Sequence, residues 1–131
     1  MSLDSVLSVF KVGIGPSSSH TFGTLKSAFR FREVIEKIEL KSQYRIQAEL
    51  MGSLALTGKG HLSDLAVIAG LGGFDIEKSR LNLEEAVAEI RGNNQIIINA
   101  VKVHFNPELD IIFNTQSVKL KHPNTIRYYL R

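Results

Sequence analysis

The sequence predicts an α+β fold: a largely antiparallel sheet with two main helices packed on one face. Apolar residues recur at helical spacing between positions 21 and 38, and a second helical segment, 61–70, is apolar nearly all round. In the second half of the chain the apolar residues change to a period of two, which is typical of strands. This order of elements favours an α+β domain. A chain of 131 residues is the size of one domain, and we expect residues 1–131 to form it.

The first half of the chain is predicted to supply both main helices. The following side chains are spaced to form the apolar face of the helix over 21–38: Phe22, Leu25, Phe29, Val34, Ile35 and Ile38. Its solvent face consists mostly of charged residues: Arg30, Arg32, Glu33, Glu36 and Lys37. The second helix begins at His61 or Leu62 and ends at the run Gly70-Leu71-Gly72-Gly73. Because it is apolar nearly all round, we expect it to be buried.

Shorter patterns predict the remaining elements. Strands are expected, in chain order, over residues 5–12, 44–51, 95–105, 110–115, 118–120 and 126–128, with a turn of extended chain at 54–56. The last four strands are expected to form two hairpins, turned at Asn106–Leu109 and at His122–Thr125. Asn82 and Glu85 have the spacing of a capping box, which predicts a third helix ending near Gly92.

Composition narrows the classes of function. Hydrophobic residues make up 44% of the chain and charged residues 22%, as in ordinary globular proteins. No apolar run approaches the ~18 residues of a membrane helix, so we expect no membrane partner and a cytoplasmic location. The net charge of +3 is concentrated near the C-terminus, at Lys119, Lys121, His122, Arg127 and Arg131. Without a nucleic-acid-binding motif, we interpret these residues as a solvated hairpin face and expect no nucleic-acid partner.

The segment Gly15–Thr21 carries the strongest local signal. Three serines, Ser17 to Ser19, precede His20 at the predicted start of the first helix. Their hydroxyl groups therefore lie beside unpaired backbone N–H groups at the positive end of the helix dipole, which suits a carboxylate or phosphate. A plain helix cap remains the alternative, since serine is a favoured cap residue.

The segment Gly52–His61 is the second signal, and it is not a nucleotide P-loop. The first glycine of that motif would fall at position 53, which is a serine, and Lys59 is followed by Gly60 instead of a hydroxyl residue. The small residues that remain let backbone approach a ligand closely. At a helix start, the dipole favours a neutral His61 imidazole that can accept a proton, although a structural histidine is the alternative.

The other histidines are interpreted differently. His104 lies on the polar phase of a strand and His122 in a turn, and both are expected to face solvent. The four histidines lack ligand spacing, so a metal site made by this chain alone is not expected.

Together, the segments VGIGPSSSHT and GSLALTGKGH..D resemble the signatures of the iron–sulfur-dependent bacterial L-serine dehydratases, or L-serine deaminases. The resemblance implies the N-terminal β-type domain of that family, as a fragment or a separate subunit. It implies an enzyme of amino-acid breakdown that converts L-serine to pyruvate and ammonia. The pyruvate would be available for gluconeogenesis. It also implies a partner, the α domain or subunit, whose cysteines hold a 4Fe–4S cluster. The chain itself has no cysteine, so we expect it to bind no cluster and to be inactive alone.

The resemblance also implies roles for the matched residues. His61 is the first candidate for a catalytic base and His20 the second. The expected substrate-binding residues are Ser17, Ser18, Ser19, Thr21, Gly58, Lys59, Gly60 and Asp64. This sequence has Phe22-Gly23-Thr24 where the family commonly has Val-Gly-Pro, which puts the start of the first helix in doubt. It has Leu62-Ser63-Asp64 where the family commonly has Ala-Thr-Asp or His-Thr-Asp.

Two other classes of function stay open. The expected fold also resembles the substrate-binding regulatory domain of some phosphoglycerate dehydrogenases, so a module that binds serine or a small anion and controls a catalytic partner is an alternative. A structural dimerisation domain is the third hypothesis, and we expect a homo-oligomer, with a dimer as the simplest form. The two histidines favour the enzyme, because a site for a carboxylate alone needs no base that titrates near neutrality.

Overall fold

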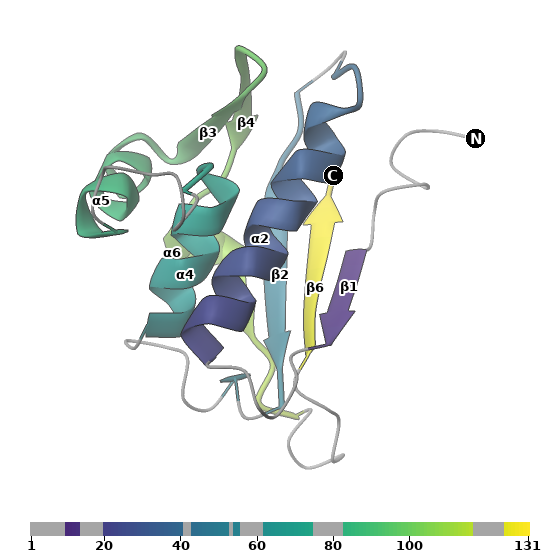
Figure 1. Ribbon diagram of the computed structural model, residues 1–131, viewed down its shortest axis with the longest axis vertical. Helices are drawn as coiled ribbons and strands as arrows, with labels where there is room; N and C mark the ends of the chain where they lie inside the picture. The colour runs from purple at the N-terminus through teal and green to yellow at the C-terminus, as the bar shows by residue number, and fades with distance from the viewer. Residues whose placement is uncertain are drawn as a thin grey trace.

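Two helices cover one face of a four-stranded sheet, and a smaller two-stranded sheet lies beside them (Figure 1). The computed structural model describes residues 10–13, 20–40, 43–52, 54–55, 62–74, 83–116 and 125–131. In chain order the elements are β1 (Phe10–Gly13), α2 (His20–Glu36), β2 (Ile46–Met51), α4 (Leu62–Leu71), α5 (Leu83–Asn93), β3 (Gln95–Ile98), β4 (Val101–His104), α6 (Pro107–Asp110), β5 (Ile111–Phe113) and β6 (Thr125–Leu130). The predicted α+β class is confirmed.

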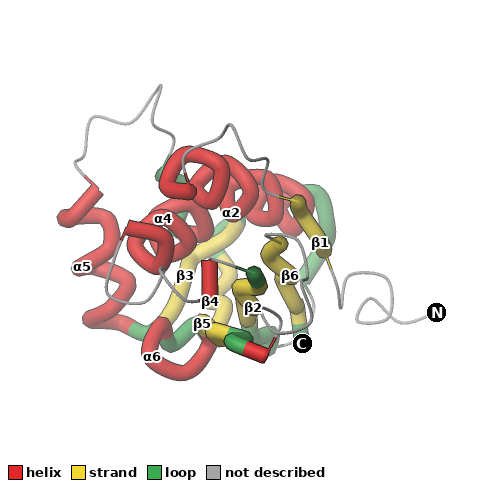
Figure 2. The backbone as a smooth tube through the Cα atoms, turned by 90° about the horizontal axis from the view of Figure 1, so that it is seen from below, coloured by secondary structure: helices red, strands yellow, loops and turns green. Residues whose placement is uncertain are grey.

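The larger sheet has the strand order β1-β6-β2-β5. The central strand β6 runs antiparallel to both β1 and β2, as predicted for a largely antiparallel sheet. The edge strand β5 runs parallel to β2, with Ala48 opposite Ile111, so the sheet is mixed. Viewed from its end, the molecule has α2 and α4 as a layer over the strands (Figure 2).

The core lies between this sheet and the two helices. On β2 the predicted alternation is confirmed, because Ile46, Ala48 and Leu50 are buried while Gln47 and Glu49 are half-buried. The fully buried apolar side chains of α2, β6 and α4 complete this core: Ala28, Phe31, Ile35, Ile126, Tyr128, Leu130, Ala66, Val67, Ile68, Ala69 and Leu71. Burial of such side chains is the main force that holds the layers together.

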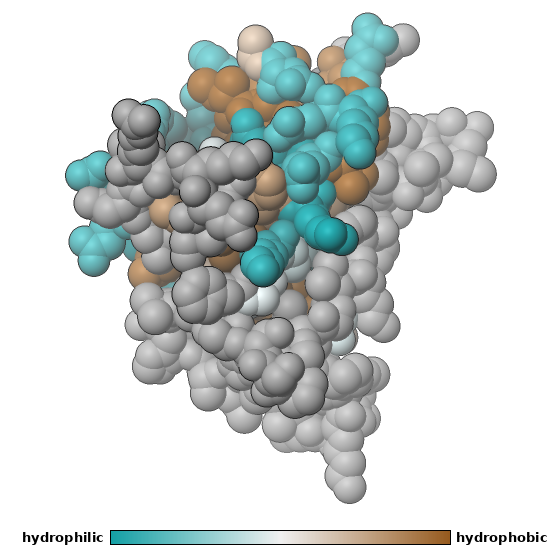
Figure 3. Space-filling view, in the orientation of Figure 1, coloured by the Kyte–Doolittle hydropathy of each residue, from teal (hydrophilic) through white to brown (hydrophobic). Residues whose placement is uncertain are grey.

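Helix α2 differs from the prediction in which side chains it buries. Its buried apolar face includes Phe31 and Ala28, which were not predicted, whereas Phe29 is only half-buried. Phe31 faces the sheet, where it stacks on Tyr128 of β6, and Ala28 lies against Gly70 of α4. Phe29 lies to the side of this buried face. Hydrophilic residues cover the outward face of the helix, where Lys26 and Arg30 are exposed (Figure 3).

Helix α4 is buried and ends as predicted. Its amide groups after the last turn complete a Schellman motif: Phe74 N–H donates to the Ala69 carbonyl at 2.9 Å, and Gly73 N–H donates to the Gly70 carbonyl at 3.1 Å. Gly73 has a φ of 90°, which favours glycine at this position. None of the helices in the described ranges is long and apolar enough to cross a membrane.

The predicted long strand over 95–105 is wrong. Residues 95–104 form a hairpin, β3 and β4, in which Gln95 lies opposite His104. The turn consists of Asn99 and Ala100, with φ of 51° and 66°. These values define the two-residue turn that normally carries Asn-Gly, so alanine at the second position concealed the turn in the sequence.

Two further predictions in the second half need correction. The predicted turn 106–109 is a one-turn helix, α6, whose N-cap Asn106 accepts from Glu108 N–H at 3.0 Å. The strand after it, β5, joins β2 of the larger sheet and does not return antiparallel along 95–105. Both edges of β6 are paired, with β1 and β2, whereas residues 118–120, its predicted hairpin partner, lie outside the described residues.

The short segment after β2 also differs. Leu54 and Ala55 have helical backbone in place of the predicted extended chain, and Ala55 N–H donates to the Gly52 carbonyl at 3.0 Å. Gly52 has a φ of 72°, so the chain turns away from the sheet directly after Met51 at a conformation that favours glycine.

Candidate functional site

The two motif segments begin at the same level of the sheet. Gly13, the last residue of β1, and Met51, the last residue of β2, are both paired with Thr125, one on each side of β6. The first motif continues from Gly13 toward α2, and the second continues from Met51 toward α4. The two motif segments, some forty residues apart in sequence, therefore start on either side of Thr125.

The two motif segments also end at the same end of the molecule. Gly70 of α4 lies against Leu25, Ala28 and Phe29 of α2. Further along both helices, Arg32 Nη1 donates to the Leu71 carbonyl at 2.9 Å. Contacts that advance in the same direction on both helices mean that α2 and α4 run parallel. Their N-termini lie together at one end of the helix layer (Figures 1 and 2).

This arrangement has a clear electrostatic consequence. The first turn of a helix has backbone N–H groups without partners in the helix, and the dipole places positive potential there. Two parallel helices add these potentials at one end, and the residues that precede the helices are the serine-rich segment and the segment ending in His61. Such a pair of helix ends is suited to an anionic ligand such as a carboxylate.

Several predicted site residues lie outside the described residues: Ser17, Ser18, Ser19, Gly58, Lys59, Gly60 and His61. His20 is the first residue of α2 and Thr21 the second, and Leu62, next after His61, is the first residue of α4. Helix α2 starts at His20 and continues through the departure from the family pattern at Phe22–Thr24. That departure therefore leaves the helix start in place.

Asp64, in the first turn of α4, is oriented by an ion pair. Its Oδ2 atom lies 3.6 Å from Arg91 Nη2 of α5, and its Oδ1 atom accepts from the Leu65 N–H at 2.9 Å. The carboxylate is 16% exposed and, with Arg91 and Ile68, lines a cavity of about 110 Å³ that α6 and β5 close on the other side. Asp64 thus faces α5 and β5, on the side of α4 away from Gly70.

The sequence interpretation missed Ser63 and Arg91. Ser63 is buried and lies two turns before Gly70 on the side of α4 that faces α2. Its position in the family pattern, where a threonine is common, was the available signal. Arg91 had no such signal, because its pairing with Asp64 joins two helices far apart in sequence.

A buried polar group lies just inside the start of α2. The Tyr128 hydroxyl lies 2.5 Å from Ser27 Oγ, which donates to the Thr24 carbonyl at 2.8 Å. The Tyr128 hydroxyl therefore acts as the donor to Ser27. Burial raises the pKa of Tyr128 well above its usual value. The phenol is consequently neutral and locks the first turns of α2 onto β6.

The donor groups of this chain do not fit a 4Fe–4S cluster. The sequence contains no cysteine, and within the described ranges no three His, Asp or Glu side chains are grouped to hold a metal. Iron–sulfur clusters are held mainly by thiolates. The thiolate ligands of such a cluster therefore cannot come from this chain.

The fold and the site define an α+β domain in which β1 and β2 end beside Thr125 and are followed in sequence by two parallel helices. The family model described as serine dehydratase beta chain matches residues 5–131, and this chain belongs to that family. An L-serine dehydratase of Helicobacter pylori (strain ATCC 700392 / 26695) is 40% identical over 124 residues, which cover 93% of this chain and 27% of that protein.

Two further relatives show the same relation. L-serine dehydratase 1 of Escherichia coli (strain K12) is 51% identical over 70 residues, which cover 53% of this chain and 15% of that protein. An L-serine dehydratase of Streptomyces coelicolor is 32% identical over 127 residues, which cover 92% of this chain and 27% of that protein. The chain thus spans about a quarter of the length of these relatives at most.

Proposed function

We propose that this chain is the β domain of an L-serine dehydratase and that its paired helix N-termini form one wall of the serine site. The observation that carries this proposal is that both motif segments start beside Thr125 and lead into parallel helices. Family membership supplies the enzyme class. The partner is the α domain or subunit, which would hold the 4Fe–4S cluster, and a cluster bound there would supply Lewis-acid chemistry toward the substrate hydroxyl.

In this proposal the two segments divide the work. The serine-rich segment, with His20 and Thr21 in the first turn of α2, binds the carboxylate of L-serine. His61, directly before α4, takes the α-proton on an imidazole nitrogen. Loss of the proton and of the β-hydroxyl yields water and 2-aminoacrylate, which hydrolyses to pyruvate and ammonia. Gly58, Lys59 and Gly60 complete the substrate pocket. Asp64, in the first turn of α4, is the last of the proposed substrate-binding residues.

Replacing the two histidines in the complete enzyme tests this proposal. His61→Asn keeps hydrogen-bonding capacity but cannot take a proton, so kcat should fall about 10²–10⁴-fold, the usual worth of a positioned base. His20→Asn should also lower activity. The effects of replacing groups that act as one unit are not additive. The activity of the double variant should therefore be only slightly below that of the less active single variant.

His104→Asn is the matched control, since His104 is exposed on β4 and its Nε2 contacts Arg45 Nη2 at 3.3 Å, away from the paired helix ends. It should leave kcat and KM unchanged. An unchanged kcat with a raised KM in His61→Asn would make His61 a binding residue. If the histidine variants keep full catalysis but no longer respond to added serine, the alternative function is favoured. In that alternative the domain is a regulatory module that binds serine, like the regulatory domain of some phosphoglycerate dehydrogenases.

The cellular setting belongs to the same proposal. The enzyme acts in the cytoplasm in amino-acid breakdown, and its pyruvate is available for gluconeogenesis. A homo-oligomer of the complete enzyme, with a dimer as the simplest form, is the assembly that we propose, and sedimentation of the complete enzyme measures it.

A further inference from the structure

We infer that Gly70 is a positioning residue: it sets the separation of α2 and α4 and thereby the position of Leu62, next after His61 in sequence, relative to the start of α2. This inference rests on the proposed function, because it concerns the geometry of that site. Gly70 lies in the last turns of α4, eight residues after Leu62, and touches none of the proposed substrate-binding residues. Its effect on the reaction is therefore exerted through the helix.

The contact at Gly70 leaves no room for a side chain. A Cβ atom at this position would lie 2.6 Å from Ala28 Cβ, 2.6 Å from the Leu25 carbonyl oxygen and 3.0 Å from Phe29 N. Carbon atoms pack best at about 3.5–4.0 Å, so one of the two helices must shift by roughly 1 Å to admit a methyl group. Two of these three atoms are α2 backbone, which cannot move away as a flexible side chain can.

The shift would be transmitted to the helix N-termini. Beyond Gly70 the helices are tied together, because Arg32 Nη1 donates to the Leu71 carbonyl at 2.9 Å and the Arg32 guanidinium lies against Gly73. A methyl group added at Gly70, next to this connection, therefore pushes the N-terminal ends of α2 and α4 apart. His20 and Leu62 each lie eight residues before the contact between Ala28 and Gly70, a lever of about 12 Å in a helix.

Two other glycines of the chain provide matched controls. Gly92, in helix α5, has no atom within 4 Å of the position that a Cβ atom would occupy. At Gly72, just after α4, a Cβ atom would meet Ile90 Cδ1, the end of a flexible side chain, and would lie 3.3 Å and 3.4 Å from the Ile68 and Ala69 carbonyl oxygens of α4 itself. None of these three nearest atoms belongs to α2. Gly92→Ala therefore adds a methyl group without a wedge, and Gly72→Ala adds one that Ile90 can accommodate.

The experiment uses Gly70→Ala, Gly72→Ala and Gly92→Ala in the complete enzyme. A 1 Å misplacement of a catalytic group can cost about 10²-fold, so we expect kcat/KM for Gly70→Ala to fall about 10- to 100-fold. The two control variants should stay within twofold of wild type. Adding Ala28→Gly to Gly70→Ala removes one of the two closest contacts and should recover part of the loss.

The isotope effect with α-deuterated L-serine separates positioning from partial unfolding. A displaced base makes proton removal slower relative to the other steps, so the effect on kcat/KM should rise in Gly70→Ala. Loss of folded enzyme would leave this ratio unchanged, because it does not depend on the amount of active enzyme. Ala28→Ser wedges the same contact with one atom from the other helix, so it provides the measurement if Gly70→Ala does not fold.

A structural measurement on the 131-residue chain keeps the two proposals apart. Amide chemical shifts of His20, Thr21 and Leu62 should move in Gly70→Ala and stay in place in Gly92→Ala. If complete wild-type enzyme fails to dehydrate serine, the proposed function fails whatever these shifts do. If His61→Asn is impaired but folded Gly70→Ala or Ala28→Ser has wild-type kcat/KM and isotope effect, the proposed function stands and the role of Gly70 is overturned.

Discussion

At the scale of single residues, the buried Tyr128 links the sheet to the helix that starts at the site. Its ring stacks on Phe31 with centroids 5.1 Å apart and an interplanar angle of 18°. Its hydroxyl bonds Ser27, which in turn bonds the Thr24 carbonyl. A buried hydroxyl without such a partner would cost about 1–3 kcal/mol. The chain of hydrogen bonds therefore fixes the rotation of α2 about its axis as well as its packing.

Tyr128 predicts a loss of stability in alkaline solution. Burial raises its pKa above the usual value of 10.0, so folding favours the neutral phenol. The unfolded chain loses this proton near pH 10 while the folded chain retains it. The contribution of Tyr128 is thus complete below pH 10 and falls by about 1.4 kcal/mol for each pH unit above it. Urea unfolding from pH 8 to pH 11 measures this, and Tyr128→Phe should lack this part of the decline. Parallel curves for the two proteins would contradict the assignment.

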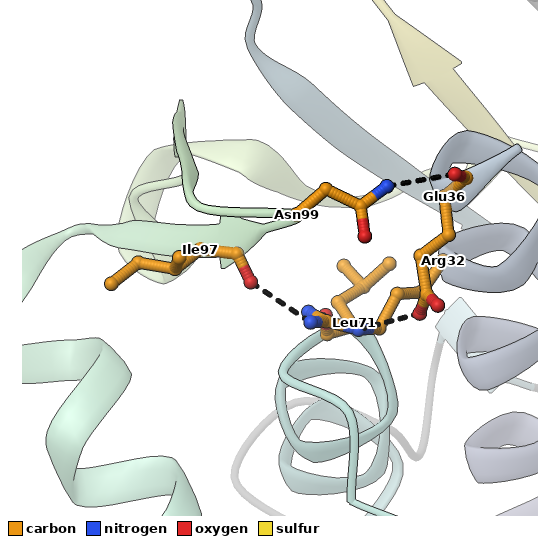
Figure 4. Close-up of polar contacts among 5 residues, drawn as sticks. All are labelled: Arg32, Glu36, Leu71, Ile97 and Asn99. Carbon is orange, nitrogen blue, oxygen red and sulfur yellow. Dashed lines mark hydrogen bonds and ion pairs between the residues drawn. The ribbon is translucent and has the colours of Figure 1, made fainter. Parts of the chain in front are cut away.

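At the scale of elements, the β3–β4 hairpin is held to the helix layer by a small polar cluster (Figure 4). Arg32 Nη2 donates to the Ile97 carbonyl at 2.8 Å, Arg32 Nη1 donates to the Leu71 carbonyl, and Asn99 Nδ2 donates to the Glu36 carbonyl at 2.7 Å. Arg32 also forms an ion pair with the Glu36 side chain at 3.1 Å. One side chain therefore connects α2, α4 and the hairpin.

Removing the Arg32 guanidinium should loosen the hairpin. Arg32→Met keeps the aliphatic part of the side chain but loses both bonds to carbonyl groups, and we expect a cost of about 1–3 kcal/mol. Amide hydrogen exchange should accelerate most in β3 and β4. Arg30→Met, at an exposed position of the same helix, is the control and should change stability by less than about 0.5 kcal/mol. Equal exchange in the two variants would argue against the cluster as the link.

The turn of the hairpin predicts a stabilising change. Ala100 has a φ of 66°, a conformation that costs about 1–2 kcal/mol for residues other than glycine. Glycine relieves this cost but loses about 0.4–1 kcal/mol through the entropy of the unfolded chain. Ala100→Gly should therefore raise stability by about 0.5–1 kcal/mol in thermal or urea unfolding. Asn99→Gly should lower it, because it also removes the hydrogen bond to Glu36.

At the scale of the whole molecule, the fold brings two distant segments to one end. The strands β1 and β2 flank β6, and the helices that follow them pack in parallel, so both connections share an end of the molecule. The chain matches 27% of the length of the Helicobacter pylori relative, and in the proposed function a partner supplies the rest of the site. In that proposal this chain contributes polar and basic groups, and the partner contributes the thiolates.

The chain by itself is therefore predicted to be inactive. Without cysteine it cannot supply thiolate ligands, so anaerobic reconstitution with iron and sulfide should yield neither iron–sulfur absorbance nor dehydration of L-serine. The complete enzyme treated in parallel is the control. A brown, active preparation of the 131 residues would contradict the division of roles between this chain and its partner.

The fold class, the positions of α2, α4 and β2, and the family could all be predicted from the sequence, because these depend on local periodicity and on contiguous motifs. The pairing of β5 with β2, the hairpin turn at Asn99 and Ala100, and the ion pair of Asp64 with Arg91 emerged from the folded chain alone. The same holds for the pairing of Gly13 and Met51 with Thr125 and for the parallel packing of α2 and α4. These features depend on contacts between residues far apart in sequence, and burial and hydrogen bonding in the assembled core select them where no local preference does.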